Sequence, residues 1–243
     1  MQPGTTPAIE HGMFDAVLSA GKNAIHRQVQ IMEDTEMKFV LVAVAAMLAL
    51  GGSWSVAEEI GPVSAALEPM ERPALRIGAT KTWQDEKGKE RTWTLTAMDE
   101  VTASFEDTNG CTQTTLHDEF TSYIAVKWDC RGNTGSGTTE LVKGDPWPLA
   151  TGKKWRYKHA GSNNKGGKWK GTHKCKVKEE VRVSVPAGEF DTYHIECRSK
   201  YTKRDYYIAP AVKTAVLYQG RHLRGRWPKY VYKLVSYDPG LPD

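Results

Sequence analysis

The stretch CKVKEEVRVSVPAGEFDTYHIEC, residues 175–197, constrains the fold more than any other part of this 243-residue chain. Its first arm alternates apolar and polar residues with a period of two, which is typical of a half-buried β-strand. Its apolar positions are Cys175, Val177, Val181, Val183 and Val185. When Cys175 is placed opposite Cys197, Val177 falls opposite Ile195 and Glu179 opposite Tyr193. This register predicts a disulfide-linked hairpin with one apolar face and a turn at Pro186-Ala187-Gly188.

The rest of the chain after residue 72 continues this pattern. Short runs rich in Thr, Val, Tyr and Trp are separated by clusters of Gly, Asn and Asp, which predicts antiparallel β structure. We expect a mainly β fold, arranged as a sandwich or an open barrel. The leader segment, residues 58–72, is expected to contain one short helix around Val63–Met70. The predicted strands are Thr80–Gln84, Arg91–Met98, Thr102–Asp107, Cys111–His117, Ser122–Asp129, Lys154–His159, Thr172–Val185, Phe190–Ser199, Arg204–Ile208, Ala215–Gln219 and Lys229–Tyr237.

A weak internal repeat divides the β region into residues 73–146 and residues 147–243. LRIGATKTWQDE, from Leu75, resembles LATGKKWRYKH, from Leu149. This predicts two related halves, with Trp83 and Trp155 packed inside them. Two glycine-rich stretches, residues 131–139 and 161–168, lack the G-K-[ST] ending of a phosphate loop and are predicted to be hairpin loops.

The segment that begins at Met37 has the features of a secretion signal. Lys38 precedes an apolar run of 12 residues, Phe39–Leu50, and small residues at 55 and 57 predict cleavage before Glu58. We therefore predict a helical signal peptide at residues 37–57 and no stable transmembrane anchor after processing. The alternative is a single membrane anchor that extends to Ala57. Residues 1–36 place acidic side chains directly before the run, which favours an over-long gene call, with a disordered extension as the other possibility.

All four cysteines follow the predicted cleavage site, so the mature protein is expected in the periplasm or secreted. An even number of cysteines in an oxidising compartment predicts two disulfides. Local spacing favours the pairs Cys111–Cys130 and Cys175–Cys197. A zinc site from His173, Cys175, His194 and Cys197 is disfavoured, because residues 194 and 197 point to opposite faces of a strand. We expect neither a metal nor a cofactor.

Charge is unevenly distributed along the chain. Residues 58–150 have a net charge of −7, whereas residues 151–243 carry 21 Lys and Arg against 8 Asp and Glu, a net charge of +13. Two interpretations are open: the halves attract each other within one domain, or the second half presents a basic face to an anionic partner.

Two tryptophans lie among bases and are predicted to be exposed. Trp169 lies among Lys165, Lys168 and Lys170, and Trp227 lies near Arg221, Arg224 and Arg226. Aromatic rings between cations suit sugars, lipid headgroups or single-stranded nucleic acid, and export makes nucleic acid the least favoured.

Two functional hypotheses follow from these residues. The first is a non-catalytic envelope protein that binds an anionic glycan, a lipid headgroup or a partner protein. The alternative is a cell-envelope hydrolase that uses carboxylates, with Glu179, Glu189 or Asp191 as the acid.

Three stretches resemble an uncharacterised family of exported bacterial β-proteins. They are WPLATGKKW (147–155), VSVPAGEFDTYHIEC (183–197) and YYIAPAVKTAVLY (206–218). They follow the pattern P-L-x-x-G-x-x-W, V-x-V-P-A-G-x-F and Y-Y-x-A-P. The resemblance implies a periplasmic all-β protein and supplies no catalytic residue. Lys213-Thr214 stands near a glycine of the pattern, so the turn after Pro210 is expected to differ.

Overall fold

The computed structural model describes residues 58–117, 125–224 and 229–240, and these ranges contain thirteen strands. The prediction of a mainly antiparallel β fold is confirmed. The described residues form no helix that has the length and apolar character needed to cross a membrane. The predicted signal helix and residues 1–36 lie outside the described ranges. The strands are β1 (Glu58–Pro62), β2 (Thr80–Asp85), β3 (Glu90–Met98), β4 (Thr102–Asp107), β5 (Thr112–Leu116), β6 (Lys127–Cys130), β7 (Asn133–Lys143), β8 (Lys154–Asn163), β9 (Lys168–Val185), β10 (Gly188–Arg198), β11 (Thr202–Ala209), β12 (Thr214–His222) and β13 (Tyr230–Asp238).

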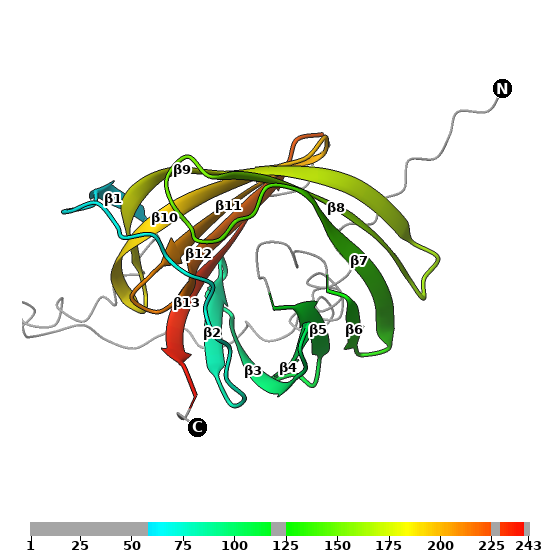
Figure 1. The fold of residues 1–243 in the computed structure, drawn as a ribbon. Helices are drawn as coiled ribbons and strands as arrows, with labels where there is room; N and C mark the ends of the chain where they lie inside the picture. The colour runs from blue at the N-terminus through cyan, green and yellow to red at the C-terminus, as the bar shows by residue number, and fades with distance from the viewer. Residues whose placement is uncertain (1–57, 118–124, 225–228, 241–243) are drawn as a thin grey trace, which may run out of the picture.

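The sheet closes on itself (Figure 1). Each strand from β2 to β13 pairs with the next one along the chain, and β13 pairs with β2, so twelve antiparallel strands form a closed barrel. Closure removes the unpaired edges that an open sheet or a sandwich would leave. Most connections in this meander are short turns, whereas the connection between β7 and β8 spans residues 144–153. Local sequence patterns predict the hairpins but carry no information on whether the last strand meets the first.

Strand β9 is the longest, with 18 residues, and it has two neighbours on one edge. Its first half pairs with β8, from Lys168 to Lys176, and its last residues pair with β1, from Val181 to Ser184. Its other edge pairs with β10 over most of the strand. The first strand after the predicted cleavage site therefore extends the sheet beyond the end of β8.

The β9–β10 hairpin forms as predicted at its cysteine end but contains a β-bulge. Cys175 pairs with Cys197 and Val177 with Ile195, whereas His194 pairs with Glu179. Lys178 is the extra residue, so the predicted pairing of Glu179 with Tyr193 is wrong, and Tyr193 lies opposite Glu180. Because a one-residue insertion turns the following side chains to the other face, the five apolar residues do not share one side.

Two apolar clusters result from this change of face. Cys175 and Val177 belong to the first cluster, together with Trp155, Tyr193 and Ile195. The valines at positions 181, 183 and 185 belong to the second cluster, with neighbours from β11, β12 and β13. The same alternation occurs in β11, where residues 206 and 208 join the first cluster and residues 207 and 209 the second.

Both predicted disulfides are present. Cys111 bonds Cys130, 19 residues away in the sequence, and Cys175 bonds Cys197, 22 residues away. All four cysteines are buried. Because Cys175 and Cys197 are bonded to each other, they are not available as zinc ligands.

Residues 63–70 form an extended strap rather than the predicted helix. Met70 makes an isolated bridge with Leu149, which lies in the connection between β7 and β8. The Tyr193 hydroxyl lies 2.8 Å from the carbonyl oxygen of Glu68 and donates to it. The amide of Leu67 donates to Glu180. The barrel thus pairs backbone groups of Leu67, Glu68 and Met70 without helical bonds.

Residues 133–143 form strand β7, although residues 131–139 were predicted to be a loop. The misleading feature is glycine, which is normally depleted in strands. Here Gly135 lies directly under the indole of Trp128, its partner on β6, and a Cβ at this position would collide with the ring. Glycine in this strand therefore marks a close approach of a neighbouring side chain. The hairpin loop predicted at residues 161–168 is shorter than expected, because β8 ends at Asn163 and β9 begins at Lys168.

Aromatic rings lie over glycines elsewhere in the barrel as well. The His159 ring covers Gly171, which pairs with it across β8 and β9, and a Cβ added to Gly171 would lie 2.8 Å from His159 Cε1. His159 is buried, so its ring has little room to move.

We expect Gly171→Ala to destabilise the fold by about 1–3 kcal/mol through overpacking. The same substitution should cost clearly less in a His159→Ala background, where the new methyl fills vacated space. Urea unfolding of the four proteins measures this coupling. Equal costs in the two backgrounds would show that the contact does not limit residue size.

Each predicted half contributes six strands, β2–β7 and β8–β13. Position 146/147 lies in the connection between β7 and β8. Trp83 and Trp155 occupy the first strand of each set, and both contribute to the first apolar cluster. The two sets form one continuous sheet.

Candidate anion-binding surface

Strands β8 and β9 place basic residues at successive outward positions. On β8, Lys154, Arg156 and Lys158 are exposed, whereas the intervening Trp155 and Tyr157 are buried. Since alternate residues of a strand point to opposite faces, the aromatic residues point into the barrel and the bases point outward. We call the outward bases of β8–β10 the basic face. Its members are Lys154, Arg156, Lys158, Lys168, Lys170, Lys174, Lys176 and Arg198.

Bases lie directly opposite one another on the basic face. Lys154 pairs with Lys176, and Lys174 is the partner of both Arg156 and Arg198. Like charges at directly opposite positions of a sheet are destabilising. Among the described residues, no carboxylate lies within 4.0 Å of the charged nitrogens of these side chains. The fold thus retains a repulsion that opposite charges do not relieve.

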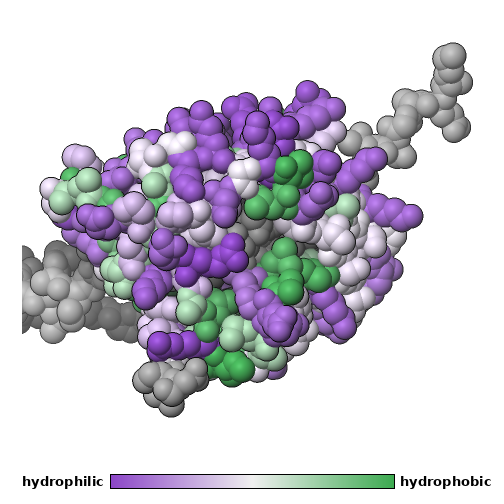
Figure 2. Space-filling view, viewed as in Figure 1, coloured by the Kyte–Doolittle hydropathy of each residue, from purple (hydrophilic) through white to green (hydrophobic). Residues whose placement is uncertain are grey.

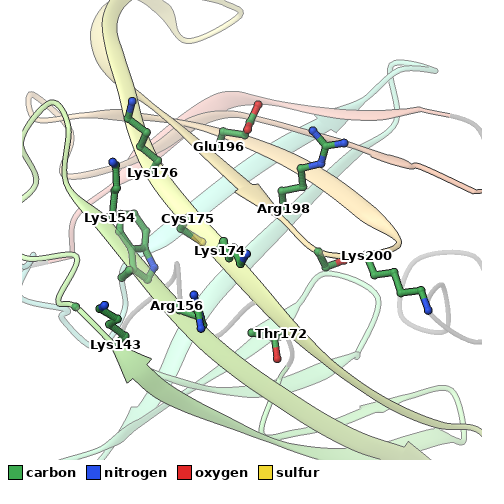
Figure 3. Close-up of a pocket in the computed structure, with 13 residues that line it drawn as sticks. Lys143, Lys154, Arg156, Thr172, Lys174, Cys175, Lys176, Glu196, Arg198 and Lys200 are labelled. Carbon is green, nitrogen blue, oxygen red and sulfur yellow. The ribbon is translucent and has the colours of Figure 1, made fainter.

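The basic face contains a hollow with a volume of about 740 Å³ (Figure 3). The close-up shows Lys154 and Lys176 extending side by side, with Arg156 and Lys174 next to them on the same two strands. Ser199 and Thr172 supply hydroxyl groups, and Glu196 is the one carboxylate in the lining. The hollow is lined by Lys143, Gly144, Lys154, Trp155, Arg156, Thr172, Lys174, Cys175, Lys176, Glu196, Arg198, Ser199 and Lys200.

Hydrophilic residues dominate this side of the molecule. Figure 2 shows them along the upper edge of the view, where β8 and β9 lie in Figure 1. Such a surface offers ammonium and guanidinium donors that can bind carboxylate, sulfate or phosphate oxygens.

Three carboxylates of β9–β11 beside the basic face already have partners. Lys203 Nζ lies 2.9 Å from Glu196 and 3.2 Å from Asp205. His194 Nε2 lies 2.9 Å from Asp205, and its Nδ1 lies 3.1 Å from Glu179. Burial raises the pKa of Asp205, but the hydrogen bond from His194 and the charge of Lys203 outweigh burial and leave this pKa below its ordinary value. These carboxylates therefore pair with Lys203 and His194 rather than neutralise the basic face.

The carboxylates of the hydrolase hypothesis are spread along the hairpin. Asp191 accepts two hydrogen bonds from Arg182, at 2.8 and 3.2 Å. These bonds lower the pKa of Asp191, which suits a structural anion better than a proton donor. Glu189 lies opposite Ser184 near the turn, and Glu179 lies opposite His194. The three residues do not form the converging pair of carboxylates that acid–base hydrolysis of a glycan requires.

Of the site residues predicted from sequence, Lys165, Lys168, Lys170, Arg221 and Arg224 are exposed. Lys168 and Lys170 belong to the basic face, and Lys165 lies in the turn that joins β8 to β9. Arg226 and Trp227 lie outside the described residues.

The predicted exposure of Trp169 is wrong. Its ring is half-buried, with its centroid 5.5 Å from that of Trp128, and it covers Gly161. Strand alternation is the reason, because Trp169 points to the opposite face from Lys168 and Lys170. The two lysines and the indole therefore do not form a shared platform.

Sequence reasoning missed most of the residues that line the hollow, including Lys154, Arg156, Lys174 and Arg198. The signal was present in KWRYK and HKCKVK, where bases occupy alternate positions of predicted strands. What the local pattern lacked was the register that places these strands side by side.

No protein-family model matches the chain, and no curated protein matches it. The resemblance to an uncharacterised exported family therefore stays a prediction. Among solved structures, the chain is similar to the hypothetical lipoprotein YmcC from Escherichia coli (K12), with a TM-score of 0.42 and 8% sequence identity. That alignment covers 65% of this chain and 83% of the other chain, and it is too weak to carry an argument about function.

Proposed function

We propose that this chain is an exported, non-catalytic envelope protein that binds an anionic component of its surroundings through the basic face. The observation that carries the proposal is the set of like-charged cross-strand pairs at Lys154–Lys176, Arg156–Lys174 and Lys174–Arg198. Their mutual repulsion costs stability, and an anion in the hollow would relieve it.

The compartment is proposed from the cysteines and the predicted signal peptide. Disulfides form and persist outside the reducing cytoplasm, and this chain has two, both buried. Together with the predicted cleavage before Glu58, they support a periplasmic or secreted protein. Anionic glycans and anionic lipid headgroups are abundant classes of partner in that setting.

The position of the bases favours a partner over internal neutralisation. If the positive second half only balanced the negative first half, its charges would be taken up by carboxylates across the contact between the halves. The bases of the hollow instead point outward, away from the barrel interior. Exposed charges of one sign attract anions over about 8 Å at physiological salt.

The test is a triple variant, Arg156→Gln/Lys174→Gln/Arg198→Gln. Its probes are heparin and vesicles of phosphatidylcholine with one-third phosphatidylglycerol. We expect the wild type to bind at least one probe, with an affinity that falls steeply between 50 and 300 mM salt. The triple variant should bind that probe about tenfold more weakly, since each exposed charge contributes modestly.

A matched control is Arg76→Gln/Lys87→Gln/Lys89→Gln, which removes the same charge from exposed positions near β2 and β3. It should keep wild-type affinity and a salt response close to that of the wild type. Equal weakening in both triple variants would show that only net charge matters. Salt-independent affinity, or no binding to either probe, would refute the proposal.

A further inference from the structure

A single row of bases crosses six neighbouring strands. Cross-strand partners connect Lys143 to Arg156, Arg156 to Lys174, Lys174 to Arg198, Arg198 to Lys203, and Lys203 to Arg221. We call these six residues the cationic row. Each comes from a different strand, β7 to β12, so the row runs across the strands, around the barrel wall. With strands about 4.8 Å apart, it spans about 24 Å.

Acidic residues border the cationic row on both sides. Glu196 on β10 and Asp205 on β11 are cross-strand neighbours. Glu196 lies two residues from Arg198, and Asp205 lies two residues from Lys203. Glu140 lies opposite Lys158, two residues from Arg156. Positive potential is therefore broadest at β8 and β9, where Lys154, Lys158 and Lys176 also flank the row, and it narrows at β10 and β11, where Glu196 and Asp205 border the row.

The curvature of the barrel wall favours a flexible polymer over a membrane surface as the partner. The row follows the closed wall of the barrel, so it bends with the circumference. A flat bilayer surface would meet only part of a curved row and would also face the bordering carboxylates. A flexible chain with regularly spaced anionic groups can follow the row and avoid them.

We infer that the anionic partner is a linear polyanion, such as a sulfated or carboxylated polysaccharide, which lies along the cationic row across β7–β12. This inference rests on the proposed function and specifies its ligand class. Five of the six bases have no ion-pair partner among the described residues, and Lys203 is held by Glu196 and Asp205.

The test measures affinity against chain length, with heparin oligosaccharides from tetrasaccharide to dodecasaccharide as probes. Affinity should rise with length and level off once a chain spans the row. The end variant Lys143→Gln/Arg221→Gln should weaken the dodecasaccharide about fivefold and change tetrasaccharide affinity by less than twofold. The control Lys87→Gln/Lys89→Gln should change neither affinity.

A gain-of-binding variant provides a second readout. Glu196→Gln removes one of the two carboxylates that hold Lys203 and lowers the negative potential beside the row. It should strengthen dodecasaccharide binding about two- to fivefold. Weaker binding by this variant would show that the bordering carboxylates do not oppose the ligand.

The outcomes separate the two proposals. Affinity that is independent of chain length, but lost in the Arg156/Lys174/Arg198 variant, would refute the linear ligand and leave the basic face as the binding site. Binding to phosphatidylglycerol vesicles without binding to any oligosaccharide would also refute the linear ligand. It would keep the basic face as the binding site and identify a membrane surface as the partner. Loss of binding to every probe would refute both.

Discussion

The double variant Cys175→Ala/Cys197→Ala should lose about 3 kcal/mol of unfolding free energy, because it releases a loop constraint across 22 residues of the unfolded chain. The bond joins two strands of the first apolar cluster, and both cysteines are at most 3% exposed, so the loss of packing adds to this value. Urea unfolding at pH 7 of oxidised protein gives the measurement, with the midpoint as the main readout.

A second double variant, Cys111→Ala/Cys130→Ala, is the matched control. Its cysteines are 19 residues apart, so the chain-entropy part of the effect should be nearly the same. Because all four cysteines are buried, the difference between the two variants then measures how much the packing around Cys175 and Cys197 differs from that around Cys111 and Cys130. Wild-type stability in the first variant would contradict the prediction.

Acid should destabilise the fold strongly through His173. Burial, followed by the nearby charge of His159, lowers the pKa of His173 from 6.5 to about 3. The unfolded chain therefore binds a proton near pH 6.5 that the folded barrel does not bind until about pH 3. Stability falls as the pH drops through this window, by about 1.4 kcal/mol per pH unit. Between pH 7 and pH 4.5 we expect a loss of about 2–3 kcal/mol from this residue alone.

His173→Gln removes this titration, so the unfolding free energy of the variant should vary less with pH than that of the wild type. The quantity to compare is the difference between the two pH profiles, because carboxylates also titrate near pH 4 in both proteins. Parallel profiles for wild type and His173→Gln would contradict the prediction.

Much of the local structure was predictable, because hairpin pairing depends on residues close in sequence. The Cys175–Cys197 bond and the pairing of Val177 with Ile195 follow from placing the two cysteines opposite each other, whereas the turn register alone, with Val185 opposite Gly188, would place Cys175 opposite Arg198 without the bulge. The strand that was missed, β7, contains Gly135, whose place in a strand depends on Trp128 of the neighbouring strand. The sequence of β7 alone does not contain that contact.

The site was predicted less well than the fold, and the bulge at Lys178 shows one reason. An inserted residue reverses the faces of the residues that follow it, yet in the sequence the valines at 181, 183 and 185 keep the odd-numbered phase of Val177, with Glu179 between them. Trp169 shows a second reason why the site was predicted less well. Its basic neighbours in sequence suggested exposure, but alternation turned the ring toward Trp128.

The sequence by itself determined the β class, the two disulfide pairs and the positive second half, because composition, spacing and a period of two are local properties. Only the tertiary structure decided that β13 meets β2 and that Lys143 and Arg221 belong to one row of bases across six strands. Both depend on the register between successive strands, which bulges and turn lengths shift one residue at a time. Such shifts accumulate around a barrel, so only its closed hydrogen-bonded ring determines which charges become neighbours.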